Sequence, residues 1–342
     1  MQRDFLQNLN QSLKNNRMKK TVALVAGGYS GEYVISIQSA AQVEDNLKED
    51  FNLYKIIIDK NDWYYEHKGE KISVNKDDFS LTIEGMKITF DAAFIIVHGT
   101  PGENGLLQGY FDMIGIPYNT CDALCSAVTF DKETCNAVVR DFNVVNVAKN
   151  HTVYAEEEID IEKILGKLSL PVFVKPSQGG SSIGMSKVKT KEELLPAIKT
   201  ALDVHPKVLI EEFIEGREFS CGIFTVDGKA SAFPVTEIIP INEFFDYEAK
   251  YNGTTSEVVP ANIPDSVRDR IQQATEKIYR ALNCKGVCRI DFIYDEKRDM
   301  LFFLEVNTTP GQSLNSIVPN QVRAMGKDVH WLYYTQMAEI LK

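Results

Sequence analysis

The sequence lacks the features of a membrane protein, a disulfide-stapled scaffold or a nucleic-acid-binding protein. No apolar run reaches the ~18 residues that a membrane span requires, and no signal peptide is recognisable. The six cysteines include no C-x-x-C pair, so we expect reduced, mostly buried thiols in a cytoplasmic protein. The net charge of −11 argues against a nucleic-acid partner, and any anionic substrate must be met by local cations.

Two common nucleotide-binding motifs are also missing. Gly27-Gly28 follows the first apolar strand, but neither the third glycine of a dinucleotide fingerprint nor a ribose-binding acid follows, which excludes NAD. Lys175 precedes a glycine- and serine-rich stretch, residues 176–184, that lacks the G-K-[ST] order of a P-loop. Backbone N–H groups and hydroxyls of this stretch could still wrap a phosphate, with Lys175 supplying charge. An ordinary surface loop is the alternative.

The chain of 342 residues is long enough for two or three domains, and its pattern changes along the sequence. The first third alternates strands and helices, which predicts a small parallel sheet covered by helices. The expected strands are 21–26, 54–59, 92–97 and 116–118, and the expected helices are 35–47 and 106–114. The middle third predicts helices at 122–126, 131–140 and 191–202 and a strand at 171–175. The last third predicts a hairpin, 217–226 with 229–237, and a helix at 266–282 after Pro264.

A second predicted hairpin near the C-terminus carries the most informative residues. By the two-residue period of a strand, one face holds Arg289, Asp291, Glu305 and Asn307. The opposite face would be a core face, formed by Ile290, Phe292, Phe302, Leu304 and Val306. Two carboxylates and an amide are hard oxygen ligands that suit magnesium, and an arginine beside them suits a phosphate or carboxylate.

Three further residues are candidate contacts, each with a structural alternative. Glu211 ends a buried strand and could accept a hydrogen bond from an adenine amino group, while Glu218 could accept from ribose hydroxyls. Both would otherwise form a solvated acidic edge. His98 follows an apolar strand, at the edge where open α/β sheets bind ligands, although a lone histidine there is often structural.

The segment from Phe244 to Tyr251 mixes aromatic residues with charges of both signs. It could fold over the site as a lid, with Lys250 contacting phosphate and Tyr251 contacting substrate. An amphipathic surface turn is the alternative.

Together these segments resemble the ATP-grasp superfamily, and within it the D-alanine–D-alanine ligases, from Met18 to Lys342. The matching runs, in order, are VALVAGGYSGEYVIS, VHGTPGENGLLQGYFDMIGIPYN, TFDKETC, PVFVKPSQGGSSIGMSKV, VLIEEFIEGREF, FDYEAKY, CRIDF and LEVNTTPGQSLNSIVP. The resemblance implies a fold of mixed α/β and α+β class, with a Rossmann-like parallel-sheet domain ahead of an ATP-grasp fold. The expected divisions are a polar appendage (1–17), the N-terminal domain (18–120), a central subdomain (121–214) and a C-terminal subdomain (215–342).

The resemblance also implies a role for each matched residue. ATP phosphates would be held by Lys132, Lys175 and Lys250, and adenosine by Glu211 and Glu218. Ser181 would lie near the γ-phosphate and the first substrate. Two Mg²⁺ ions, or Mn²⁺ in their place, would be bound by Asp291, Glu305 and Asn307, with Glu305 bridging. The tetrahedral intermediate would be stabilised by Arg289 and Gly311. The substrates would be contacted by His98, and the second D-alanine's carboxylate by Ser316 and Ile317.

Two positions bear on the choice of substrate. Tyr at position 251 goes, in this family, with dipeptide formation, whereas Phe goes with relatives that use D-lactate. The acid expected for the first D-alanine's ammonium would fall at Val34, which cannot accept a hydrogen bond. Glu32 or another acceptor would then replace it, or water would meet the ammonium, or affinity would be weak. A Glu–Tyr–Ser network through Tyr251 and Ser181 is expected to lack its acid.

The resemblance therefore implies a cytoplasmic, homodimeric enzyme that uses ATP and magnesium to join two D-alanines through a D-alanyl phosphate, for peptidoglycan synthesis. It implies no nucleic-acid or membrane partner. Two alternatives remain open at this point. One is another ATP-grasp ligase with a different carboxylate and nucleophile, and the other is a nucleotide-binding protein without activity.

Overall fold

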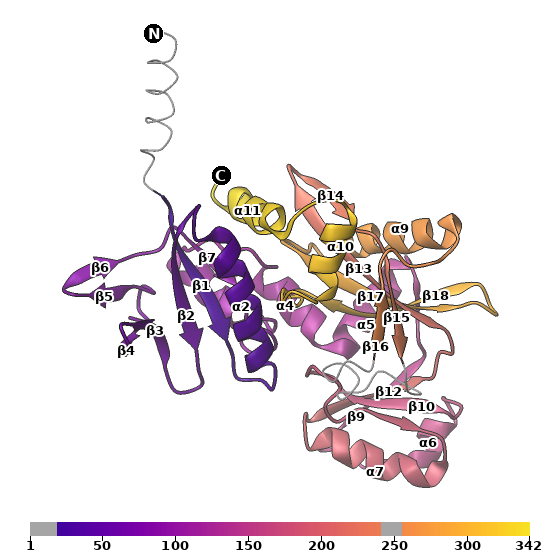
Figure 1. Ribbon diagram of the computed structural model, residues 1–342. Helices are drawn as coiled ribbons and strands as arrows, with labels where there is room; N and C mark the ends of the chain where they lie inside the picture. The colour runs from indigo at the N-terminus through magenta and orange to yellow at the C-terminus, as the bar shows by residue number, and fades with distance from the viewer. Residues whose placement is uncertain (1–18, 241–254) are drawn as a thin grey trace.

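The protein's structure, a computed structural model, describes residues 19–240 and 255–342. Within them the chain forms sheets of five, four and seven strands and a separate two-stranded hairpin. Figure 1 shows the five-stranded sheet at the left, the seven-stranded sheet at the right and the four-stranded sheet below it. The expected appendage, residues 1–17, lies outside the described residues. No described helix combines the length and apolar character needed to cross a membrane.

The five-stranded sheet has the order β4-β3-β2-β1-β7. Its strands are β1 (Thr21–Gly27), β2 (Asn52–Ile58), β3 (Trp63–His67), β4 (Glu70–Ser73) and β7 (Ala92–Ile95). The central strands β2, β1 and β7 are parallel, as predicted, whereas β3 and β4 add an antiparallel edge. The expected strand at 116–118 is wrong, because only a single bridge joins Tyr118 to Ala93. Beyond β4 lies the hairpin of β5 (Leu81–Ile83) and β6 (Met86–Ile88).

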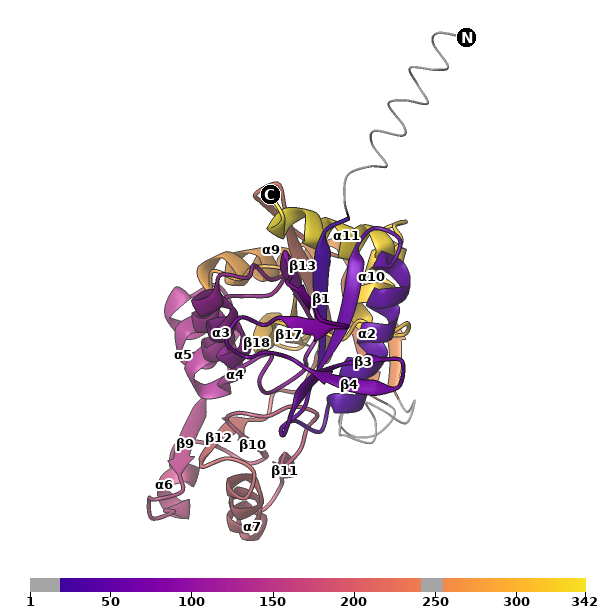
Figure 2. The same ribbon diagram turned by 90° about the vertical axis from the view of Figure 1, so that its left-hand side faces the viewer.

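Strand β1 is buried on both faces, which is why its sequence is a continuous apolar run. Val22, Leu24 and Ala26 pack against α2 (Tyr33–Leu47) and α11 (Val329–Ile340). Ala23 and Val25 face the opposite layer, with α3 (Leu106–Ile114). The C-terminal helix therefore returns to cover the first sheet, as Figure 2 shows from the side.

The four-stranded sheet is antiparallel and has the order β11-β10-β12-β9. Its strands are β9 (Asn150–Tyr154), β10 (Val172–Pro176), β11 (Ser186–Val188) and β12 (Lys207–Glu212). One face packs on α6 (Ile161–Leu165) and α7 (Lys191–Leu202), the latter opened by a Thr190–Glu193 capping box. The alternate residues, among them Phe173, Lys175 and Glu211, face a cavity instead.

The seven-stranded sheet has the order β16-β15-β13-β17-β18-β8, with β14 paired to β13. Its strands are β8 (Asn146–Val147), β13 (Arg217–Val226), β14 (Lys229–Ala232), β15 (Thr236–Pro240), β16 (Thr255–Val258), β17 (Cys288–Asp295) and β18 (Met300–Asn307). Helices α4 (Ala123–Phe130), α5 (Lys132–Phe142), α9 (Asp265–Ala281) and α10 (Ile317–Ala324) accompany it. The segment 229–237, predicted as the second strand of a hairpin, is divided between β14 and β15. Pro234 lies between them and has no N–H to donate to a strand ladder.

A β-bulge in the β17–β18 ribbon corrects the predicted core face. Asp291 pairs with Glu305 but Phe292 pairs with Phe303, so Leu304 is an extra residue. The bulge reverses the alternation, because it moves Phe303 into the core beside Phe292. Phe302 packs in a separate cluster with Ala148 and Ile214. Placing Phe302 and Leu304 on the core face was therefore wrong, while Ile290, Phe292 and Val306 lie there as predicted.

Candidate active site

A cavity of about 950 Å³ is bordered by the four-stranded sheet, the seven-stranded sheet and loops of the N-terminal domain. Its volume is at the upper end of the range for small-molecule sites. Within the described residues, every predicted site residue except Asp291 lines this cavity. They are His98, Lys132, Lys175, Ser181, Glu211, Glu218, Arg289, Glu305, Asn307, Gly311, Ser316 and Ile317. Lys250, Tyr251 and the rest of the predicted lid lie outside the described residues.

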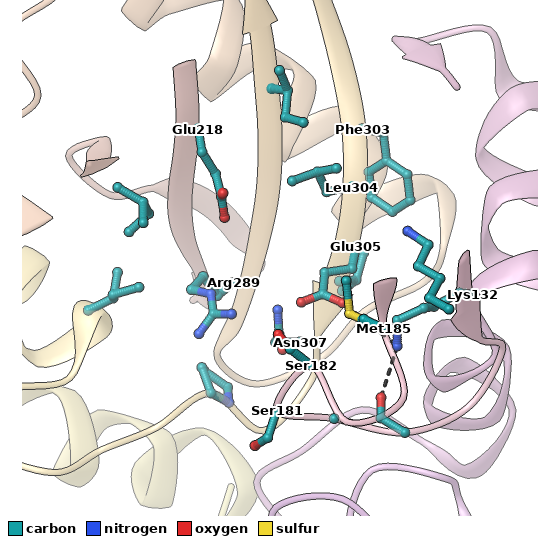
Figure 3. A pocket seen from close by; sticks show the side chains of 18 of the residues that line it. Lys132, Ser181, Ser182, Met185, Glu218, Arg289, Phe303, Leu304, Glu305 and Asn307 are labelled. Atoms are coloured by element: carbon teal, nitrogen blue, oxygen red, sulfur yellow. Dashed lines mark hydrogen bonds and ion pairs between the residues drawn. The ribbon is translucent and has the colours of Figure 1, made fainter. Parts of the chain in front are cut away.

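The β17–β18 ribbon supplies the acidic side of the cavity. Arg289 pairs with Asn307 and Asp291 with Glu305, so the four predicted residues share one face ahead of the bulge. Figure 3 shows Arg289, Glu305 and Asn307 pointing into the cavity, with Glu218 on the neighbouring strand. These side chains come from positions far apart in the sequence, and the antiparallel pairing brings them together.

Asp291 lies on the same face but is only 5% exposed, because its neighbours contact its carboxylate. Its carboxylate accepts hydrogen bonds from Arg289 Nε and Nη2, at 2.9 and 2.8 Å, and from Ser220 Oγ, at 2.6 Å. Asn307 Nδ2 also donates to it, at 3.0 Å. Asp291 therefore compensates the buried guanidinium and orients Arg289 toward the cavity.

The donor set of the ribbon fits a hard divalent cation. Asp291 and Glu305 are carboxylates on paired positions, and Asn307 is adjacent to both through the same register. Carboxylate and amide oxygens are the ligands that Mg²⁺ and Mn²⁺ prefer. Asn307 would have to turn its amide oxygen, not its nitrogen, toward the ion. No soft ligand lies among these three residues.

The glycine- and serine-rich stretch is anchored to the start of α5. Lys132 donates its backbone N–H to Ser177 O at 2.8 Å, and its Nζ to Gly179 O at 2.9 Å. Lys132 Nζ also lies 3.9 Å from Glu305 Oε2, so this cation stands between the loop and the ribbon (Figure 3). Ser181 and Ser182 both have positive φ, at 53° and 59°, which turns the loop sharply at the cavity. The stretch is thus held against a helix and is no ordinary surface loop.

Asp131, the N-cap of α5, fixes this junction. Its carboxylate accepts from Thr134 N at 3.0 Å, from Ser177 Oγ at 3.0 Å and from Gln178 Nε2 at 3.1 Å. Lys207 Nζ lies 2.6 Å away. Burial would raise the pKa of Asp131, but Lys207 and the other donors outweigh it and hold the pKa well below its usual value. Sequence reasoning assigned no role to Asp131.

Lys175 and Glu211 form an ion pair in the wall of the cavity, with side chains that are 9% and 8% exposed. Asn136 Nδ2 donates to the other oxygen of Glu211, Oε1, at 2.6 Å. The pair is nearly dry, so each partner is needed to compensate the other's charge. Glu211 therefore lies where an adenine base could contact it, but its carboxylate already binds two protein groups, Lys175 and Asn136.

Glu32 is one of the acceptors expected to replace the acid that is missing at Val34. It is the residue before α2, and its Oε1 accepts a hydrogen bond from Ser181 Oγ at 2.9 Å. A Cβ at Gly180 would lie 2.7 Å from Glu32 Oε2, so a larger residue there would displace the Glu32 side chain. Val34 is 61% exposed. The Glu32 carboxylate thus borders the cavity and already binds Ser181, which favours Glu32 among the expected replacements.

His98 is 5% exposed, and its surroundings define one tautomer. Its Nδ1 lies 2.8 Å from the carbonyl of Thr309 and must donate to it. Nε2 lies 3.3 Å from Ser39 Oγ and accepts from that hydroxyl. Burial lowers the pKa of His98, so the ring is neutral at neutral pH.

Glu103 is a second carboxylate that the sequence argument overlooked. It accepts from the backbone N–H groups of Gly99, at 2.8 Å, and of Thr309, at 3.1 Å. Burial and the nearby charge of Glu32 raise its pKa to about 7. It lies within the matching run that begins at Val97, but no pattern of spacing marks it as a cavity residue.

The N-terminus of α10 closes the far end of the cavity. Ser316 is its N-cap residue, and Ser316 Oγ lies 2.8 Å from Ser313 Oγ. A Cβ on Gly311 would lie 3.0 Å from the same hydroxyl. Unpaired N–H groups of a helix's first turn favour an anion, and a carboxylate would be well placed here.

Comparison with known proteins gives one consistent result. Residues 21–121 match the family model described as D-ala D-ala ligase N-terminus, and residues 136–338 match D-ala D-ala ligase C-terminus. The D-alanine--D-alanine ligase of Phocaeicola vulgatus is 45% identical over 314 residues, which are 91% of this chain and 96% of that protein. The D-alanine--D-alanine ligase of Porphyromonas gingivalis is 44% identical over 313 residues, 91% and 94% of the two chains.

Solved structures agree with this result. The VanG D-Ala:D-Ser ligase from Enterococcus faecalis superimposes with a TM-score of 0.83 at 32% identity, covering 94% of this chain and 99% of that one. The D-alanyl-alanine synthetase A from Vibrio cholerae gives a TM-score of 0.85 at 26% identity, with coverages of 95% and 99%.

Proposed function

The chain belongs to the D-alanine–D-alanine ligase family, and from this we propose that the cavity between its four-stranded and seven-stranded sheets is where ATP and two D-alanines react. The enzyme joins two D-alanines to D-alanyl-D-alanine at the expense of ATP, and the dipeptide serves peptidoglycan synthesis. One observation carries the location. One cavity is lined by Lys132, Lys175 and Arg289, by the acidic ribbon and by a helix N-terminus, the groups that phosphate and carboxylate chemistry requires.

The first step brings like charges together. The carboxylate of the first D-alanine attacks the γ-phosphate of ATP, giving D-alanyl phosphate and ADP. Two unit charges at ~4 Å repel by ~1 kcal/mol in water, and by several times more in a drier cavity. Lys132 and Lys175 line the cavity on the side of the glycine- and serine-rich loop and would offset this repulsion.

Divalent cations complete the charge balance. The residues that would hold them are Asp291, Glu305 and Asn307, and we propose two Mg²⁺ ions with Glu305 shared, Mn²⁺ being an alternative. A cation bound there would neutralise phosphate oxygens and orient the triphosphate.

The chain's own residues then orient the two amino acids. Glu32, already bonded to Ser181, is placed to accept from the ammonium of the first D-alanine. The N-terminus of α10, with Ser316 and Ile317, would receive the carboxylate of the second. Neutral His98 would border the first substrate without adding charge.

The second step is attack of the second D-alanine's amine on the acyl carbon, after which phosphate leaves. Arg289, fixed by Asp291, and the N–H of Gly311 would face the developing oxyanion. Loss of one such donor costs ~3 kcal/mol of barrier, or about 10²–10³-fold in rate. D-Alanyl phosphate is sensitive to water, which gives the segment from Phe244 to Tyr251 a purpose as a lid.

The remaining assignments are proposals of the same kind. Adenosine would contact Glu218 and the strand end at Glu211, where Phe173 and Met185 add apolar walls. We keep the domain divisions at residues 18–120, 121–214 and 215–342. We further propose that the enzyme is a homodimer and that it is cytoplasmic. The six cysteines, which are all free thiols in the structure, are in keeping with the cytoplasm.

The test is phosphate release from ATP and Mg²⁺ with different amino acids. D-alanine alone should support release, and L-alanine should not. The structural similarity to a D-Ala:D-Ser ligase makes D-serine the natural second candidate, and D-lactate tests depsipeptide formation. Faster product formation with D-alanine plus D-serine than with D-alanine alone would reassign the second substrate. No release with any of them would overturn the proposal.

A further inference from the structure

Four of the six cysteines gather at one place outside the catalytic cavity. Cys121 and Cys125 flank the start of α4, and Cys284 and Cys288 flank the turn between α9 and β17. The two segments are about 160 residues apart in sequence, yet each contributes a pair with the spacing C-x-x-x-C. The side chains are 0–7% exposed.

Three of the four sulfur atoms lie close enough together to bind one metal ion, and the fourth, that of Cys288, lies outside this group but against Cys121. Cys121 Sγ lies 3.5 Å from Cys288 Sγ, and Cys125 Sγ lies 3.6 Å from Cys284 Sγ. The sulfurs of Cys121, Cys125 and Cys284 all lie within 4.8 Å of one another. Zinc binds thiolates at ~2.3 Å in a tetrahedron, which separates the sulfurs by ~3.8 Å. A disulfide would need ~2.05 Å.

Two backbone features favour negative charge on the α4 side of the cluster. The backbone N–H of Lys285 donates to Cys121 Sγ, at 3.3 Å. Cys121 and Cys125 lie at the N-terminus of α4, where the helix dipole stabilises negative charge.

We propose that Cys121, Cys125, Cys284 and Cys288 form a structural site for one soft divalent cation, zinc in the first place. Each thiol gives up its proton as its sulfur–metal bond forms, so loading releases protons to the buffer. Four protein ligands leave no open position, which makes the site structural and not catalytic. The bland alternative is four small buried side chains that merely fill the core around α9.

The position of the site gives it a consequence for the enzyme. Cys288 immediately precedes Arg289 on β17, and α4 leads directly into α5, which begins with Lys132. A bound metal would link these two segments through sulfur–metal bonds. The linked segments lie next to the elements that carry Arg289 and Lys132, two cationic side chains of the catalytic cavity. A Cβ on Gly286 would lie 1.9 Å from Asn119 O, so the segments already pack with no spare room.

The first experiment is a titration of the full chain with Co²⁺. The protein is stripped of metal, reduced with a phosphine and kept without oxygen, in excess Mg²⁺ to saturate oxygen-ligand sites. We expect sulfur-to-cobalt charge-transfer absorption and strong tetrahedral visible bands, saturating at one ion per chain and lost on adding Zn²⁺. Saturation without these bands, or no binding, would overturn the proposal.

Variants then assign the bands to these cysteines. Cys125→Ser and Cys284→Ser remove ligands, and Cys221→Ser is the matched control, a fully buried cysteine of β13 outside the cluster. Competition with a chromophoric chelator should show zinc affinity at least about tenfold lower in the ligand variants and unchanged in the control. If a ligand variant does not fold, the cobalt spectrum of the wild-type chain still tests whether a tetrahedral thiolate site exists.

Intact mass and thermal melting of the parent chain complete the test. Metal-loaded chain should be heavier by one zinc less the protons displaced, and should melt at a higher temperature than stripped chain. A mass two or four hydrogens below that of the reduced chain would instead show disulfides among these thiols. Equal zinc affinity in ligand variants and control would also contradict the site.

Discussion

Asp291 and Glu305 face each other across the β17–β18 ribbon, and we expect their neutral amide variants to fail in different ways. Asp291 is 5% exposed and is the charge partner of Arg289, bonded to it at 2.8 Å. In Asp291→Asn the buried guanidinium loses its compensating charge, which costs ~3 kcal/mol in proteins. The Glu305 side chain is 32% exposed and lies 3.9 Å from Lys132 Nζ, so Glu305→Gln should change stability by less than ~1 kcal/mol.

Activity should separate from stability in this pair. Loss of groups that only support a metal ligand costs about 10–100-fold, so loss of the ligand itself in Glu305→Gln should remove nearly all turnover. The assays are denaturant unfolding without ligands and phosphate release at saturating ATP, Mg²⁺ and D-alanine. Asp291→Asn should be defective in both, and Glu305→Gln in turnover alone. Wild-type turnover of Glu305→Gln would refute the metal assignment, and parental stability of Asp291→Asn would refute the ion-pair argument.

Two further substitutions test other parts of the site. Burial and the charge of Glu32 raise the pKa of Glu103 from 4.5 to about 7, so this carboxyl contributes stability below pH 4.5 that is lost as pH rises through about 7. The lowered pKa of His98 acts in the opposite direction, and Glu32 moderates that lowering. Glu32→Gln should therefore make the slope of unfolding free energy against pH more positive between about pH 4.5 and 7. Denaturant titrations of both proteins at several pH values measure this slope. An unchanged slope in the variant would contradict the coupling. Lys250→Ala should lower turnover strongly with the circular dichroism spectrum intact, whereas unchanged turnover at saturating substrate would remove Lys250 from the lid.

The sequence predicted elements well wherever periodicity and end signals coincide. Helix α7 spans Lys191–Leu202 as expected, because a capping box marks its start. Helix α3 ends at Ile114 as expected, because Gly115 adopts the left-handed conformation, with φ of 73°. The division of β14 from β15 and the bulge at Leu304 were missed, because both depend on which strand pairs with which. Strand pairing is determined by contacts between residues far apart in the sequence, and a local sequence pattern does not predict them.

The sequence predicted which residues line the candidate site better than it predicted how they bond to one another. The described residues expected to meet in one cavity do so, apart from Asp291, which is buried beside them and does not line it. Glu32 was one of several acceptors expected to replace the acid missing at Val34, and its position at the start of α2 brings it to Ser181. Glu103 was missed because one of its donors is the backbone N–H of the distant Thr309, and the role of Asp131 was missed because Ser177, Gln178 and Lys207 reach it from distant segments.

The central claim is that the acidic ribbon binds divalent cations and through them the nucleotide's phosphates. Calorimetric titration of a non-hydrolysable ATP analogue, with Mg²⁺ and with chelator, tests it most directly in the parent chain and in Glu305→Gln. We predict tight uptake by the parent that requires Mg²⁺, and a loss of that requirement together with most of the affinity in the variant. Equal nucleotide binding with and without Mg²⁺ in the parent would contradict the account.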